Sequence, residues 1–198
     1  MAGILRKLAL QKRSILSTTV RLSQRNAWNR TCVTSKRTFI ACIPRLDRIS
    51  DAEEQIKIGS EHLNKGSLDM AMNSYHKSVQ LAPSGTGYFN IGVCYFQMGK
   101  HHDAIKSFER SLEYTPNSPD AHTNIATSYL MLKDTENAIK HLEKASNFDP
   151  LDGEIQYNLA CVYEAVGRLN DAKTRFERAE MQGIEKATEA LEKLKKKL

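Results

Sequence analysis

Three asparagines recur at a fixed interval along the chain: Asn90, Asn124 and Asn158 are each separated by 34 residues. An asparagine side chain both donates and accepts hydrogen bonds. A regular series of such side chains could bind the backbone of an extended peptide with little dependence on the peptide's sequence. The same residues could instead hold neighbouring helices together, so both roles stay open at this point.

The residue types that support catalysis or bind metals are not arranged for either task. The sequence has no Gly-rich phosphate loop, no Gly-x-Ser-x-Gly elbow and no His-Glu-x-x-His motif. His101 and His102 are adjacent, whereas paired metal ligands on a helix lie three or four residues apart. His122 occupies a position for a large packing residue, and His141 is expected on a solvated helix face. We therefore expect no enzyme activity, no cofactor, no metal site and no small-molecule substrate.

The asparagines belong to a longer repeat that runs through most of the chain. Prolines recur at intervals of 33 and 34 residues, and a column of alanines recurs at 33, 34 and 34: Pro83, Pro116, Pro150 and Ala71, Ala104, Ala138, Ala172. Three further columns hold small, aromatic and large apolar residues: Gly59, Gly92, Ala126, Ala160; Tyr95, Tyr129, Tyr163; and Tyr75, Phe108, Leu142, Phe176. Within one unit the apolar residues recur mostly at steps of three and four, which is a helical period.

These columns resemble the tetratricopeptide repeat, a 34-residue helix–turn–helix unit. The resemblance covers Ala52 to Gly183 and implies an all-α fold, a right-handed α-solenoid. The implied units are four helix pairs at 52–84, 85–118, 119–152 and 153–183, then a capping helix at 184–198 with a lysine-rich end. The helices are expected at 52–65, 68–81, 85–98, 101–114, 119–132, 135–148, 153–166, 169–182 and 184–197. The small column is expected where two helices approach closely.

The resemblance also implies a binding face, because the first helices of such repeats line a concave surface. In this register the face holds the three asparagines together with Phe89, Val93, Phe96, Asp120, Met131, Glu154 and Tyr157. An apolar groove rimmed with acid suits an apolar or basic peptide, although part of this stripe must also pack the solenoid. Family members that bind chaperone carboxylates use Lys, Asn, Asn, Lys and Arg, and here those positions hold Ile56, Ser60, Asn90, Asp120 and Asn124. Chaperone binding through a carboxylate clamp is therefore not expected.

Residues 1–43 have a composition unlike the rest of the chain. They carry no Asp or Glu, and they are rich in Arg, Lys, Ser and Thr. Ile4, Leu5 and Leu8 can share one side of a helix, as in an organellar transit peptide. We predict a mitochondrial transit peptide that is cut near Phe39, and a mature protein in the matrix. The alternative is a basic tail that binds an acidic surface.

The net charge of +6 invites a nucleic-acid interpretation. Without the nine bases that precede residue 42, however, 20 basic residues face 23 acidic ones, whereas a phosphate-binding surface needs clustered Lys and Arg. No apolar run is long enough for a transmembrane segment. The sequence therefore predicts a non-enzymatic protein–protein interaction module that binds a peptide segment of a partner, as a mitochondrial adaptor, assembly factor or chaperone-like scaffold. The alternative is a helical-repeat protein that binds RNA in mitochondrial gene expression.

Overall fold

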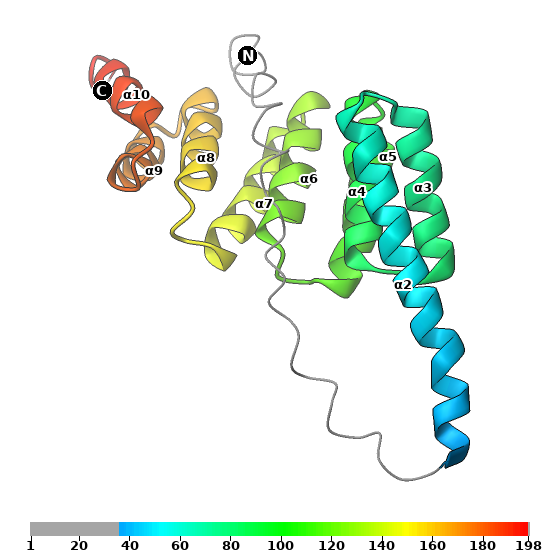
Figure 1. Ribbon diagram of the computed structural model, residues 1–198. Coiled ribbons are helices and arrows are strands. Elements are labelled where there is room, and N and C mark those ends of the chain that lie inside the picture. Colours follow the sequence, from blue (N-terminus) through cyan, green and yellow to red (C-terminus); the bar gives the residue numbers. More distant parts are fainter. Residues whose placement is uncertain (1–35, 198) are drawn as a thin grey trace. The chain divides into compact units, whose positions relative to one another are not determined.

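The structure, a computed structural model, describes residues 36–197, and for 36–45 it describes the backbone alone. Helices joined by short turns make up this part of the chain, which contains no strand (Figure 1). The helices are α2 (Lys36–Asn64), α3 (Leu68–Leu81), α4 (Gly85–Gln97), α5 (His101–Tyr114), α6 (Pro119–Met131), α7 (Thr135–Phe148), α8 (Gly153–Ala165), α9 (Leu169–Met181) and α10 (Glu185–Lys195). The expected all-α fold of four helix pairs and a last helix is confirmed, and every expected helix after the first begins within one residue of its expected start.

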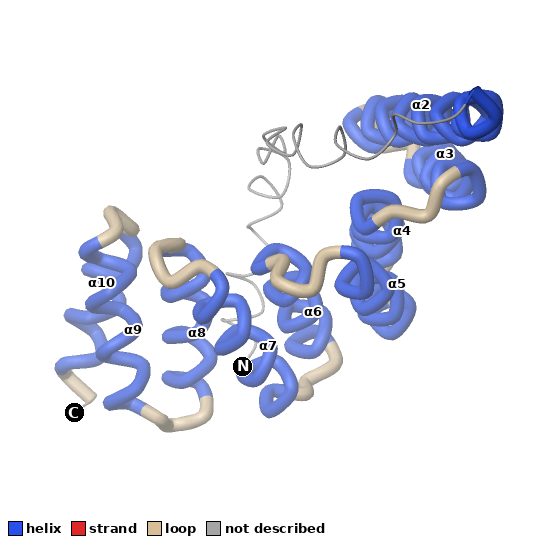
Figure 2. Tube along the Cα trace, turned by 90° about the horizontal axis from the view of Figure 1, so that it is seen from below, coloured by secondary structure: helices blue, strands red, loops and turns tan. Residues whose placement is uncertain are grey.

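The described residues form two compact units, 36–83 and 84–197. In the first unit α2 packs against α3. In the second unit the pairs are α4 with α5, α6 with α7, and α8 with α9, and each pair packs on the next through its second helix (Figure 2). The last helix, α10, continues this order by packing on α9. None of the described helices is both long and apolar enough to cross a membrane.

The first helix begins earlier than the repeat pattern predicts, at Lys36 in place of residue 52. The repeat columns do not extend before Ala52, so they give no signal there. Between Arg45 and Ala52 the chain has neither Gly nor Pro, and nothing interrupts the helix. Leu46 and Ile49 on this extension are exposed. The predicted transit peptide therefore overlaps α2 at residues 36–43, and its remaining part, 1–35, lies outside the described residues.

The small-residue column lies where paired helices touch, as expected. A Cβ atom on Gly92 of α4 would lie 2.6 Å from the ring of Phe108 on α5, closer than real side chains pack. Phe108 is fully buried and cannot move aside. Ala126 and Ala160, which hold the same position in the next two pairs, are also fully buried. Only a residue with little or no side chain allows the two helices to pack at this distance.

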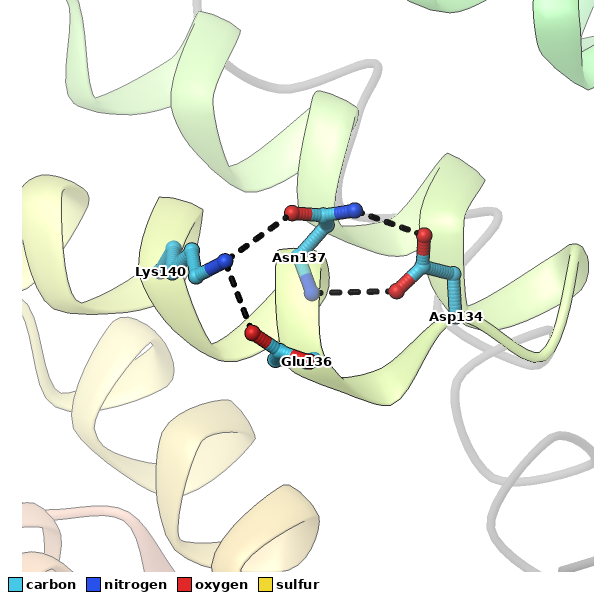
Figure 3. A network of polar contacts seen from close by, with 4 residues as sticks. All are labelled: Asp134, Glu136, Asn137 and Lys140. Atoms are coloured by element: carbon cyan, nitrogen blue, oxygen red, sulfur yellow. Dashed lines mark hydrogen bonds and ion pairs between the residues drawn. The ribbon is translucent and has the colours of Figure 1, made fainter.

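Polar side chains fix the start of α7 (Figure 3). Asp134 accepts hydrogen bonds from the backbone N–H of Asn137 at 3.1 Å and from its side-chain Nδ2 at 2.7 Å. These bonds satisfy an otherwise unpaired N–H of the first helical turn, and they lower the pKa of Asp134. Lys140 forms an ion pair with Glu136 at 2.9 Å one turn further on. The equivalent positions before α4, α6 and α8 hold Ser84, Ser118 and Asp152, which cap their helices in the same way.

A second column joins the start of each first helix to a residue 26 positions later. Tyr88 stacks on Tyr114 with ring centroids 5.8 Å apart, and His122 stacks on Phe148 at 5.5 Å. The expected packing role of His122 is confirmed, since it is only 5% exposed. The expectation for His141 is wrong: this side chain is half-buried, and its Nδ1 lies 3.0 Å from Nδ1 of His122. The two rings meet because α6 and α7 form one pair, which helical periodicity alone does not reveal.

The fourth repeat replaces the stacked ring with a buried polar network. Gln156 of α8 is fully buried. Its Nε2 donates to Oγ of Ser146 at 2.9 Å and to the carbonyl of Pro150 at 3.2 Å. Arg175 of α9 donates to Oε1 of Gln156 and to Oγ of Ser146, both at 3.0 Å. The network connects α7, α8 and α9, so these three helices are held together by hydrogen bonds as well as by apolar contact.

Candidate functional site

The three asparagines lie at the same register of α4, α6 and α8, but their surroundings differ. Asn90 and Asn124 are partly exposed, whereas Asn158 is only 6% exposed. Asn124 donates from Nδ2 to the carbonyl of Asp120 in its own helix at 2.8 Å, which leaves its side-chain oxygen able to accept another bond. Oδ1 of Asn158 is buried and has no hydrogen-bond partner among the described residues. The series therefore offers two accessible amides and one covered amide.

The large apolar residues expected on the binding face pack mainly within the helix pairs. Phe89 contacts Phe108 with ring centroids 5.4 Å apart, and Phe96 lies edge-on to His101 at 5.2 Å. Val93 is 5% exposed. Met131, at the end of α6, is 39% exposed. Much of the apolar stripe therefore stabilises the pairs, and Met131 is its most accessible member in the second unit.

Acidic side chains gather where α6 and α8 begin. Partial burial, together with the carboxylates of Asp152 and Asp149, raises the pKa of Asp120. Asp152 caps α8 by accepting from the backbone N–H groups of Glu154 and Ile155 at 2.8 and 3.1 Å. Glu154 is half-buried on the first turn of the same helix. The local charge is negative, as the sequence predicts for this rim, and it favours a basic group on whatever binds nearby.

The fourth repeat presents its face differently from the second and third. Tyr157 is 9% exposed and contacts Phe176 of α9 at a ring-centroid distance of 5.6 Å. Burial, followed by interactions with Cys161, Glu154 and Glu189, raises the pKa of Tyr157. Since Glu189 belongs to α10, the last helix lies near this face. The predicted site residues Tyr157 and Asn158 are therefore covered in this conformation.

One neighbouring residue did not enter the sequence prediction. Thr123 stands in the column of Phe89 and Tyr157, next to Asn124, and its buried Oγ1 has no hydrogen-bond partner among the described residues. The change from an aromatic residue to threonine in that column was the available signal. In the part of the chain that the structure describes, no three His, Cys, Asp or Glu side chains are grouped so that they could hold a metal ion. The accessible chemistry of this face is hydrogen bonding and negative charge.

Comparison with known proteins identifies the repeat. Tetratricopeptide repeat models match residues 55–84 and 83–150. The tetratricopeptide repeat and J domain-containing co-chaperone DNJ1 of Cryptococcus neoformans is 29% identical over 75 residues, which are 37% of this chain. The chain spans only 14% of the length of that relative.

Solved structures support the same fold. MamA superposes with a TM-score of 0.64 and 22% identity, over 77% of this chain and 86% of that one. YrrB, described as a tetratricopeptide repeat protein with an unusual peptide-binding site, superposes with a TM-score of 0.60 and 21% identity, over 73% of this chain and 74% of that one. The repeat matches, the paired helices and the small-residue column agree with one another. The chain is a tetratricopeptide repeat protein, of a scaffold family that is typically non-enzymatic.

Proposed function

We propose that this protein–protein interaction module binds a peptide segment of a partner along α4 and α6, and that it acts in mitochondria as an adaptor, assembly factor or chaperone-like scaffold. The observation that carries the proposal is the pair Asn90 and Asn124, which share one register and are both partly exposed. Each amide can pair with the backbone of a bound segment. Asp120 beside them favours a segment that carries a basic residue.

The comparisons support binding of a protein segment as the kind of function. YrrB has a peptide-binding site on the same fold, and the DNJ1 relative is a co-chaperone. Stacked repeats of this type present an extended surface, because each repeat contacts only its neighbours and leaves one face of its first helix open. A segment of a partner protein is therefore the ligand class that this architecture suits best.

Replacing Asn90 and Asn124 together by Ala should weaken partner binding. Two neutral hydrogen bonds contribute roughly 0.5–1.5 kcal/mol each, so the affinity should fall by roughly 5- to 150-fold. Affinity capture from mitochondria followed by mass spectrometry identifies the partner with the wild-type protein. Titration calorimetry with that partner then measures the loss for the double variant.

The matched control replaces Asn73 and Asn147, exposed asparagines on the second helices α3 and α7, by Ala. This control should bind the partner like the wild type. Urea unfolding of both variants separates lost binding from lost folding, since a purely structural role predicts lower stability with unchanged affinity per folded molecule. Equal binding by wild type and double variant would refute the asparagine site, and capture of RNA without any protein would favour the RNA-binding alternative.

The mitochondrial address is a separate part of the proposal. It is supported by the acid-free, basic composition of residues 1–43. Import should remove about 40 residues and leave the protein in the matrix. N-terminal sequencing of the protein purified from cells checks this, and an intact start at Met1 or Ala2 on a cytosolic protein would contradict it.

A further inference from the structure

The last helix lies along one face of α8. Nζ of Lys197, two residues after the end of α10, lies 2.7 Å from Oε1 of Glu164 on α8. Eight residues before Lys197, Glu189 acts on Tyr157, which lies seven residues before Glu164. Helices rise about 1.5 Å per residue, so these two contacts are about equally far apart on both helices. The two helices therefore run in the same direction along this face.

Apolar side chains hold α10 in this position. Ala187, Leu191 and Leu194 follow the spacing i, i+4, i+7, and all three are buried in one cluster with Tyr157 and Val162 of α8. Against α9, α10 packs in the order that α6 follows against α5 and α8 against α7 (Figure 2). The last helix thus takes the place that the first helix of a further repeat would occupy.

The fit between α10 and the inner residues of α8 is incomplete. Asn158 is 6% exposed, whereas its equivalents Asn90 and Asn124 are partly exposed. Its side-chain oxygen is buried without a hydrogen-bond partner among the described residues. A buried acceptor without a donor destabilises the state that contains it. The covered state therefore carries a cost at Asn158 that an occupant with a suitable donor would remove.

We propose that the α8 docking face, formed by Tyr157, Asn158, Cys161 and Glu164, is a helix-binding site that α10 occupies in the free protein and that an amphipathic partner helix takes by displacing α10. The chemistry of the partner follows from that of α10. It carries a small residue and two leucines at i, i+4 and i+7, then a basic residue at i+10 that pairs with Glu164. The inference rests on the proposed function, since it assumes a protein ligand, and adds a second class of segment at the fourth repeat.

The hinge for this displacement is the short connection between α9 and α10. Gly183 has a φ of +82°, a conformation that glycine adopts without strain. Next to it, Ile184 lies against Gly153, where a Cβ atom would be 2.6 Å from the isoleucine side chain. The connection is thus anchored at the start of α8. Beyond it, α10 is held on α8 by the apolar cluster and by the ion pair of Lys197 with Glu164.

A labelled peptide of residues 184–198 tests the site with the chain's own occupant. The protein is the full chain, as wild type and as Leu191→Asp, which unseats α10 and leaves the docking face vacant. A site that is filled in cis lowers the apparent affinity for an added ligand by the fraction of vacant molecules. Fluorescence anisotropy should show the peptide binding to Leu191→Asp at least about tenfold more tightly than to wild type. The same peptide with Leu191→Asp in its own sequence should not bind.

Lys197→Glu is the second variant, because Leu191→Asp could also reduce folding. Lys197 is exposed, and the substitution removes only the ion pair with Glu164. Peptide binding should increase about two- to fivefold over wild type. Adding Glu164→Lys restores the ion pair in cis and repels Lys197 of the peptide, so this double variant should bind no better than wild type. Far-UV circular dichroism checks that all variants remain helical.

Two outcomes would overturn the displacement. One is equal binding of the peptide to wild type and to helical Leu191→Asp. The other is no effect of Lys197→Glu on peptide binding. Neither outcome depends on Asn90 or Asn124, or on any partner captured from cells. Failure here is therefore distinguishable from failure of the proposed function, which the asparagine double variant tests.

Discussion

Gly92→Val should be the most damaging single substitution on the inner side of the second repeat. A Cβ at this position lies 2.6–3.0 Å from three ring atoms of Phe108, which is fully buried. The branched side chain forces α4 and α5 apart or drives the ring from its position. Overpacking of this kind costs about 1–3 kcal/mol, and we expect a loss near the upper end, about 3 kcal/mol. Urea unfolding followed by circular dichroism measures the change in the free energy of unfolding.

A relief variant distinguishes the steric cause from a general intolerance of the helix. The third repeat combines Ala126 with Leu142 at the two equivalent positions. Phe108→Leu combined with Gly92→Ala copies that solution. The two substitutions should therefore be less destabilising together than the sum of the single variants, since each relieves the other's strain. A strictly additive double variant, or a Gly92→Val protein as stable as wild type, would show that the ring contact does not limit helix approach.

The helix pairs could be predicted from the sequence because their cause is local and repeated. The small column and the large column set the distance between two paired helices, and the breaker residues between units set the turns. The same reasoning failed for α2, which begins at Lys36, because no repeated column extends before Ala52. Helix continuation there depends on helix-forming residues without an interruption, and that signal is weak on its own.

The candidate site was only partly predictable, because burial depends on which helix lies next to each column. Asn90, Asn124 and Asn158 are indistinguishable in the repeat pattern. In the structure only Asn158 is covered, near a helix that follows the last repeat. Similarly, Phe89 occupies an inner position by register but contacts Phe108 of its own pair. A column gives the direction in which a side chain leaves its helix, whereas a neighbouring element decides whether that side chain meets solvent.

The histidine pair between α6 and α7 should make the protein less stable in mild acid. Nδ1 of His122 and Nδ1 of His141 are 3.0 Å apart, so one ring donates and the other accepts when both are neutral. Burial, with the nearby charges of His122 and Lys144, lowers the pKa of His141 to about 4. Burial and Lys144 also lower the pKa of His122. Both rings are therefore held neutral in the folded protein down to a pH well below their ordinary pKa of 6.5.

The direction of the effect follows from proton binding by the unfolded chain. As the pH falls below about 6.5, the unfolded chain binds protons at these histidines before the folded protein does, so the free energy of unfolding decreases. The decrease continues to about pH 4, where His141 also becomes protonated in the folded state. Since His141 is only half-buried, we expect the pair to account for about 2 kcal/mol across this range, less than the full shift implies.

His122→Tyr isolates this contribution, because Tyr88 fills the same position in the second repeat and stacks on Tyr114 as His122 stacks on Phe148. The variant keeps a ring for packing and removes one titrating group together with its contact to His141. Urea unfolding at several pH values between 7.5 and 4 should show a shallower pH dependence for His122→Tyr than for wild type. His76→Gln, at an exposed histidine, is the control and should leave the wild-type slope unchanged. Parallel curves for wild type and His122→Tyr would mean that the acid sensitivity comes from carboxylates instead, because their protonation is common to both proteins.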